Sequence, residues 1–476
     1  MRTLPDEAWR TAGPWIVAGL AILVLAVKWP TLGAPAWWDE MGWLRQAAWL
    51  SENGVLRVLP GTRPDAAFWG HPPGLHLTAA IPFMLTGPSR WVAHLVIAGF
   101  AAVGVCATFL LGRLWYDART GALAALTLLL TPAYFAQAGL FLADLPVAAL
   151  AVLCAYLAVT QRYLAYLLVA SYMVMLKETA MAVVAAVALL RVLSGHVPVG
   201  VRVVEAMRYA APLLVIGGFI ALQKLVTGRA FFIFDFAFEP FTVTSPGAVA
   251  RQALAITRWL FVDQFRWVLT LAVVLDLVVH RASVTRPALL LLALVVPLSG
   301  YAFSVMYFVP RYVLPVLPFF CVVAAGAALR LARSGNRRTV VAVAVPALMA
   351  IALLRESAQG SGETDLSYLR GMEVHRAMAR TIAERHPDAR ILTEWPNGLE
   401  LDDPLYGYVE RPLRVLWYRP DEPLPQAELA LVSSPANARM DALARVAERA
   451  GWTVMSRMAD AGFTVTLYAT GLPAER

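Results

Sequence analysis

The sequence predicts an α-helical polytopic membrane protein of about eleven transmembrane helices, followed by a small α/β domain. Of its 476 residues, 59% are hydrophobic and only 15% are charged, which is too apolar for one soluble core. Apolar runs recur between residues 14 and 355, and each is long enough, or nearly so, to cross a hydrocarbon layer of about 30 Å. Beyond residue 356 the apolar runs shorten to strand length and alternate with helical patterns.

The predicted transmembrane domain covers residues 1–356. Its expected spans are 14–30, 91–112, 121–138, 145–160, 163–176, 178–193, 209–227, 266–280, 287–305, 311–331 and 339–355. We expect the run 72–87, which opens with HPPG and contains Pro82, to be an interfacial or re-entrant helix. If it crossed the membrane, every later loop would change sides.

The distribution of arginine predicts the orientation of these spans. With eleven spans, the links on one side together hold twelve Arg, while bases are sparser per residue in the links on the other side. Because basic residues favour the cytoplasmic side, the segment 31–90 and the C-terminus are predicted to lie outside the cytoplasm. Trp37, Trp38, Trp43 and Trp49 are then expected to form an aromatic belt around a short surface helix at about 40–51.

The second predicted domain, residues 357–476, is a small extracytoplasmic α/β domain. Helical patterns cover 368–386 and 438–450, and the predicted strands are 390–394, 414–418, 429–434, 452–456 and 463–469. This part holds 17 acidic and 13 basic residues, so the basic surplus of the chain lies in the membrane part. That surplus indicates contact with anionic membrane lipid and argues against a nucleic-acid partner.

Ionisable residues beside or inside apolar runs are costly, and each is a candidate functional residue. They form five short motifs: DE at 39–40, HPPG at 71–74, ADLP at 143–146, KE at 177–178 and RY at 311–312. Each motif also has an ordinary structural reading, such as a helix N-terminus, a proline turn, a loop ion pair or a snorkelling cation. The predicted topology nevertheless places all five on the outer face.

This ordered set of motifs resembles the GT-C-type polytopic glycosyltransferases. The resemblance is to the bacterial relatives of the protein O-mannosyltransferases (glycosyltransferase 39-like) and of the aminoarabinose transferase that modifies lipid A, over residues 14–320. It implies an inverting transfer of a sugar from a polyprenyl-phosphate donor on the periplasmic face of a bacterial inner membrane. Asp39 would be the catalytic base, and His71, where many members have Lys, would contact the donor phosphate.

The residue types suit that chemistry. A carboxylate such as Asp39 in a partly desolvated site can accept a proton from an acceptor hydroxyl. The leaving phosphate is a stable anion and needs fixed positive charge more than a general acid, which Lys177 and Arg311 can supply. Glu40 and Asp144 are expected to orient the acceptor or the site. Two further residues, Glu178 and Tyr312, are expected to support it.

Other assignments stay open at this stage. The acceptor could be a lipid, a glycan or a protein side chain, reacting through a hydroxyl or a phosphate. Two neighbouring acids could hold a divalent cation, but no His/Cys cluster with metal-ligand spacing is present, and no cofactor is assigned. The main alternative function is a secondary transporter or lipid flippase without transferase chemistry. A scaffold subunit is a second alternative.

Overall fold

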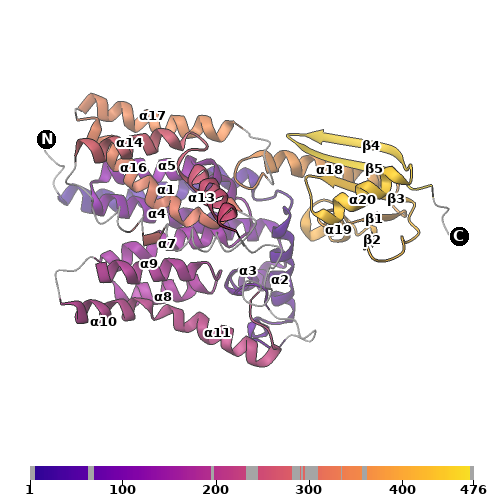
Figure 1. Cartoon of the computed structure of the whole chain (residues 1–476), viewed down its shortest axis with the longest axis horizontal. Helices are drawn as coiled ribbons and strands as arrows, with labels where there is room; N and C mark the ends of the chain where they lie inside the picture. The colour runs from indigo at the N-terminus through magenta and orange to yellow at the C-terminus, as the bar shows by residue number, and fades with distance from the viewer. Residues whose placement is uncertain are drawn as a thin grey trace.

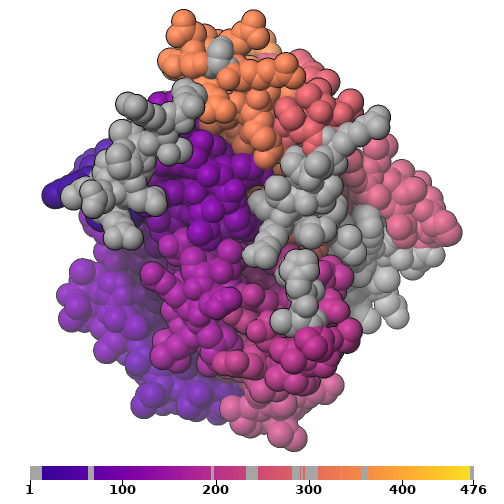
Figure 2. All heavy atoms as spheres, turned by 90° about the vertical axis from the view of Figure 1, so that its left-hand side faces the viewer, coloured from indigo at the N-terminus to yellow at the C-terminus, as the bar shows by residue number. Residues whose placement is uncertain are grey.

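The computed structural model describes residues 6–62, 69–193, 198–231, 245–280, 290, 293–294, 309–333, 335–355 and 362–471. Figure 1 shows two parts side by side, a helical part up to α17 and a smaller part built around a β-sheet. Figure 2 shows the end of the helical part that lies away from the sheet.

The helical part consists of long apolar helices and shorter ones. Its described α-helices are α1 (Asp6–Lys28), α2 (Asp39–Asn53), α3 (Gly74–Thr86), α4 (Arg90–Trp115), α5 (Ala118–Leu130), α6 (Pro132–Gln137), α7 (Asp144–Val159), α8 (Tyr163–Val174), α9 (Ala180–Leu193), α10 (Val199–Ala210), α11 (Pro212–Thr227), α13 (Pro246–Phe261), α14 (Arg266–Val279), α16 (Leu317–Leu331) and α17 (Gly335–Leu354). Three 3₁₀ turns, η1 (Trp29–Thr31), η2 (Val55–Val58) and η4 (Pro310–Val316), join some of them.

The structure supports a multi-pass membrane protein. Among the described helices, four are long and apolar enough to cross a membrane: Gly13–Thr31, Arg90–Trp115, Pro310–Leu331 and Gly335–Leu354. A fifth span is possible if α10 and α11, which are bent by 48°, count as one. Five further apolar helices are shorter. The number eleven therefore stays a prediction, and the predicted span 287–305 lies mostly outside the described residues.

The predicted span 121–138 is not one straight helix. α5 ends at Leu130, Thr131 has an extended backbone, and α6 begins at Pro132. Proline lacks the N–H that would continue the helix, and it disfavours helical backbone in the residue before it, so the break falls where the chain places Pro132.

The segment 72–87 forms the 13-residue helix α3. A helix of this length spans only about 20 Å, short of a hydrocarbon layer. Its first turn is held at Gly74, whose N–H donates to the Met175 carbonyl at 2.7 Å. A Cβ atom at Gly74 would lie 2.4 Å from that oxygen, so this close approach of backbones requires glycine.

Small residues bring α4 close to its neighbours. A Cβ atom at Gly112 would lie 2.8 Å from the Cα of Gly121 on α5, and one at Gly104 would lie 3.0 Å from Ala149 on α7. The buried Tyr134 hydroxyl donates to the Ala101 carbonyl at 3.0 Å. Such contacts are typical of helix association inside membranes, where close van der Waals packing replaces the hydrophobic effect.

The C-terminal part contains one mixed sheet and three α-helices. The strands are β1 (Arg390–Thr393), β2 (Arg414–Trp417), β3 (Leu429–Ser434), β4 (Thr453–Asp460) and β5 (Phe463–Ala469), in the order β2-β1-β3-β5-β4. The helices are α18 (Ser367–Arg385), α19 (Asn397–Asp402) and α20 (Ala438–Arg449), with a short 3₁₀ turn η5 (Pro404–Tyr406). β2, β1 and β3 are parallel, whereas β5 and β4 are antiparallel to their neighbours. All five predicted strands and both predicted helices are present.

The segment before α2 joins the two parts. Both backbone polar groups of Ala36 bond to the C-terminal part. The Ala36 N–H donates to the Tyr406 carbonyl at 2.9 Å, and the Ala36 carbonyl accepts from the Tyr408 side-chain hydroxyl at 2.9 Å. Trp37 is fully buried and packs edge-on against Phe463 of β5. The predicted aromatic belt is therefore wrong for Trp37, because the sheet covers that side chain. The domain boundary at residue 356 stays a prediction.

Candidate active site

One pocket of about 240 Å³ lies where α2, the loop before α3, the start of α7, the α8–α9 link and η4 meet. In Figure 1, α2 and α3 lie at the end of the helical part nearest the sheet. Six of the predicted site residues line this pocket: Asp39, His71, Asp144, Lys177, Arg311 and Tyr312. The motifs are spread over more than 270 residues, and the fold brings them to one place.

Asp39 is the first residue of α2 and the most open acid of the pocket. Its side chain is 48% exposed, whereas Asp144 is 4% exposed. Trp38, just before it, has φ 45° and ψ −114°, a backbone conformation that non-glycine residues rarely adopt. Trp38 stacks on Trp37 at 5.4 Å and meets Trp395 edge-on at 5.5 Å. These ring contacts hold the turn that points Asp39 into the pocket.

Arg311, in η4, connects three carboxylates. Its Nη2 lies 2.6 Å from Asp39 Oδ2, its Nε lies 3.3 Å from Asp144 Oδ2, and its Nη1 donates to Glu363. The guanidinium is 9% exposed. A planar fork with separate donors suits this arrangement, which a lysine ammonium could not reproduce with the same geometry.

Lys177 lies in the link between α8 and α9 and pairs with Asp144. Its Nζ is 2.7 Å from Asp144 Oδ1 and 4.2 Å from the centre of the Tyr312 ring. Burial alone would lower the pKa of Lys177, but Asp144 together with Tyr312 and Glu178 outweighs burial and raises that pKa above its ordinary value. Lys177 is therefore a permanent cation of the pocket.

His71 lines another part of the pocket, and Glu178 contacts His71. His71 Nδ1 lies 3.1 Å from both Glu178 carboxylate oxygens, and the Trp43 ring stacks on His71 and on His76. Burial alone would raise the pKa of Glu178, but His71, which is also hydrogen-bonded to it, and Lys177 together lower that pKa below its ordinary value. Glu178 is thus an anion that holds His71 in place.

Glu40 points away from the pocket. It is fully buried and accepts hydrogen bonds from the Trp37 and Phe141 backbone N–H groups, each at 2.9 Å, and it also contacts His94 Nε2. Two successive helix residues differ by about 100° in direction, so Asp39 and Glu40 cannot both face the pocket. The position of Glu40 suits holding the start of α2 and does not place its carboxylate against a substrate in the pocket.

Sequence reasoning did not find Glu363. This residue follows α17 in the loop before α18 and is 3% exposed. Burial raises the pKa of Glu363, and the Asp39 carboxylate raises that pKa further against the opposing effect of Arg311. The surrounding sequence SGETDLS resembles any polar linker, and no local pattern distinguishes this acid from Asp365. Only its contact with Arg311 reveals it.

The charges of the pocket are unequal. Lys177 and Arg311 are the permanent cations, and both are paired with acids. They are outnumbered by the carboxylates in or next to the pocket, which are Asp39, Asp144, Glu178 and Glu363. Within the described residues, no group of three or more His, Cys, Asp or Glu side chains could hold a metal ion. An anionic ligand would therefore have to compete with a carboxylate for one of the two cations.

Comparison with solved structures bears on the fold. The chain is similar to ArnT from Cupriavidus metallidurans, bound to undecaprenyl phosphate, with a TM-score of 0.62 and 16% identity over 98% of this chain and 100% of that one. The apo form of ArnT matches with a TM-score of 0.61 and 15% identity, again over 98% of this chain and 100% of that one. The Archaeoglobus fulgidus oligosaccharyltransferase in complex with Zn and sulfate matches with a TM-score of 0.50 and 11% identity, over 84% of this chain and 62% of that one.

The chain has the GT-C fold. The GT-C-like architecture expected from the sequence is thereby confirmed. No family model matches the sequence, and no curated protein matches it. Because the match to ArnT covers 98% of this chain, the similarity extends over the C-terminal sheet as well as the helical part.

Proposed function

We propose that this protein transfers a sugar from a polyprenyl-phosphate donor, with inversion at the anomeric carbon, to a hydroxyl or phosphate group of an acceptor on the periplasmic face of the bacterial inner membrane. The observation that supports this most is the pocket that joins the half-exposed Asp39 to the buried Arg311 and Lys177. The donor class is suggested by ArnT, whose structure was solved with undecaprenyl phosphate bound. Whether the acceptor is a lipid, a glycan or a protein stays open.

The proposed reaction is a single displacement. The acceptor oxygen attacks the anomeric carbon and its proton passes to Asp39, while the bond between that carbon and the phosphate oxygen breaks. The bonding electrons leave with polyprenyl phosphate, whose growing negative charge Arg311 and Lys177 stabilise. Asp144 orients Lys177, and Tyr312 lies against the same ammonium group.

Binding of the donor would also prepare the base. In the structure Asp39 Oδ2 accepts a hydrogen bond from Arg311 Nη2, so this oxygen is already engaged. A donor phosphate that takes over the Arg311 guanidinium would release the Asp39 carboxylate to face the acceptor hydroxyl. The base would then become active only when a donor is present.

The site location speaks against the transporter alternative. The pocket lies at one end of the helical part, close to the sheet, whereas transporter sites generally lie near the middle of the membrane. A flippase would also have no need of an exposed carboxylate beside two cations.

The test is transfer by the purified protein in liposomes with synthetic polyprenyl-phosphate sugars and total envelope extract as acceptor. We expect Asp39→Asn to lower the transfer rate by about 10²–10⁴-fold, as loss of a general base does. The exposed acid Glu448, on α20, supplies the matched control Glu448→Gln, which should keep full activity. Equal rates for Asp39→Asn and wild type would reject Asp39 as the base, and donor movement without transfer would favour a flippase.

A further inference from the structure

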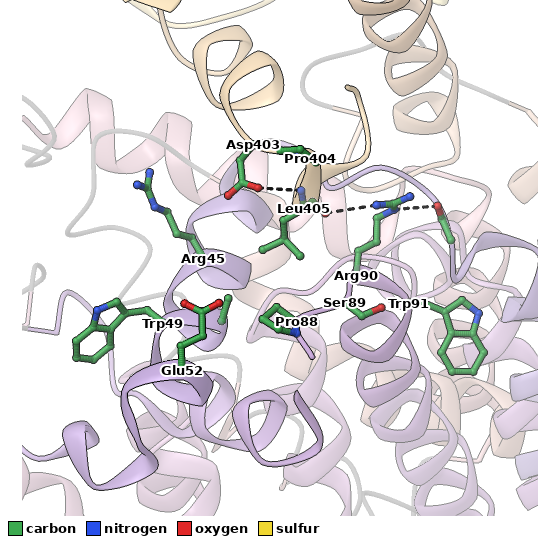
Figure 3. Close-up of a pocket in the computed structure, with 12 residues that line it drawn as sticks. Arg45, Trp49, Glu52, Pro88, Ser89, Arg90, Trp91, Asp403, Pro404 and Leu405 are labelled. Carbon is green, nitrogen blue, oxygen red and sulfur yellow. Dashed lines mark hydrogen bonds between the residues drawn. The ribbon is translucent and has the colours of Figure 1, made fainter. Parts of the chain in front are cut away.

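Two larger hollows adjoin each other outside the candidate active site. The first, of about 850 Å³, lies between α2, the start of α4 and the loop that contains η5 (Figure 3). The second, of about 750 Å³, lies between the start of α4, α18 and the loop before β2. They share the lining residues Arg90 and Pro404 and therefore adjoin each other, and the two together are called the depression. The proposed transfer reaction uses none of their lining residues.

Helix α2 separates this depression from the active-site pocket. Asp39, Gly42, Trp43 and Gln46 line the pocket, and Arg45, Ala48, Trp49 and Glu52 line the first hollow. Both sets follow the spacing i, i+3, i+4, i+7, which marks one face of a helix. The two faces differ by about 120° at 100° per residue. The depression is thus a separate site on the same helix.

The second hollow carries an excess of positive charge. Its charged lining residues are Arg90, Arg376, Arg380, Arg411, Glu384 and Glu410. Arg376 and Arg380 stand one turn apart on α18 and so face the same side. Like charges gathered in one hollow repel each other, and an anionic ligand would relieve this repulsion.

Among these four arginines, only Arg376 is paired with a carboxylate within the described residues, and at long range. The Arg90 guanidinium donates to two backbone carbonyls, those of Gly33 at 3.2 Å and Leu405 at 3.5 Å (Figure 3). Arg376 comes no closer than 3.9 Å to the exposed Glu373. In the described part of the chain, no carboxylate pairs with Arg380 or Arg411. The donors of Arg380 and Arg411 can therefore bind a ligand without first breaking an ion pair, and the pair that Arg376 would give up is long and exposed.

The level of the depression relative to the membrane indicates that its ligand comes from the bilayer. Arg90 is the first residue of α4, a 26-residue apolar helix, and the next residue, Trp91, lines the first hollow. Trp91 contacts the 62%-exposed Trp29 edge-on at 5.5 Å. Exposed tryptophans at the end of a spanning helix mark the level of lipid headgroups. An anion held here can keep its acyl chains in the bilayer.

We propose that this depression is a second binding site, which takes the phosphate-bearing headgroup of a membrane lipid. Arg90, Arg376, Arg380 and Arg411 bind the phosphate through charge-assisted hydrogen bonds. The lipid tails leave along α4 past Trp91. The proposal does not depend on transferase activity, because the site lies on the other face of α2.

The test measures binding of dihexanoyl phosphatidic acid to the full-length protein in a neutral detergent, by microscale thermophoresis. Dihexanoyl phosphatidylcholine and inorganic phosphate are titrated in parallel. We expect phosphatidic acid to bind at least about tenfold more tightly than either, and we expect Arg376→Gln/Arg380→Gln to weaken its binding by at least about tenfold.

The control is Arg445→Gln/Arg449→Gln, which removes the same charge at the same spacing from the exposed face of α20. It should leave the affinity for phosphatidic acid within about twofold of wild type. Equal weakening by both double variants would assign the binding to surface charge in general. Equal affinity for inorganic phosphate and phosphatidic acid would make this a site for free anions. Either result overturns the proposal.

Discussion

Arg311 and Asp39 form an ion pair of 2.6 Å although 272 positions separate them in the chain. The same guanidinium also contacts Asp144 and the buried Glu363. The most exposed acid of the pocket is thus tied to a buried cation. An anion that binds the Arg311 Nη2 group has to displace the Asp39 carboxylate.

Loss of Arg311 is expected to destabilise the protein as well as to stop transfer. Arg311→Gln leaves the 3%-exposed Glu363 without its cation, and breaking such a buried pair costs about 3–5 kcal/mol. The midpoint of thermal unfolding in detergent should fall accordingly. The double variant Arg311→Gln/Glu363→Gln should recover part of this loss, because the second change removes the unpaired buried acid. No recovery would mean that the two side chains are not coupled.

Trp395 is expected to act on Asp39 through Trp38. The Trp38 backbone, with φ 45°, is held in a conformation that costs on the order of 1–3 kcal/mol. Trp395→Ala removes an edge-on ring contact worth about 0.5–1.5 kcal/mol. We expect the transfer rate to fall by a factor of about 2–10 with little change in KM for the donor, and Trp395→Phe to retain most activity. A change in KM alone would contradict this role.

Glu178 is expected to make stability depend on pH in the acid range. Its folded-state pKa lies below the ordinary value of 4.5 because His71 and Lys177 outweigh the effect of burial. A lowered pKa contributes stability above the ordinary value, and this contribution is lost as the pH falls through the folded pKa. Between about pH 6 and pH 3, the unfolding temperature of wild type should therefore fall more steeply than that of Glu178→Gln. Glu448→Gln should follow wild type, and parallel curves for all three proteins would contradict the assignment.

Gly74 is expected to tolerate no side chain. Gly74→Ala would place Cβ 2.4 Å from the Met175 carbonyl oxygen, and overpacking of this kind costs about 1–3 kcal/mol. The matched control is Gly217→Ala in α11, where no heavy atom lies within 4 Å of the new Cβ. Alanine is the better helix former, so Gly217→Ala should raise the unfolding temperature slightly. A neutral result for Gly74→Ala would show that this contact is loose.

Much of the architecture could be predicted from the order of the residues. Strand-length apolar runs such as 429–434 and 463–469 have the observed bounds of β3 and β5, because local alternation and flanking turn residues specify strands. Helix ends were less predictable. Pro132 breaks a run that reads as one span, and whether such a run bends or stops depends on its neighbours.

The candidate site, too, could be predicted from the sequence only in part. Its polar motifs stand out in the sequence, because ionisable groups beside apolar runs are costly wherever they lie. The sequence by itself therefore determined that the protein is a multi-pass membrane protein, which residues are candidates, and their order along the chain. Tertiary structure decided that Asp39 faces the pocket while Glu40 faces the core, and that Glu363 joins Arg311. Adjacent helix residues point about 100° apart, and only the packing of distant segments determines which of them meets the site.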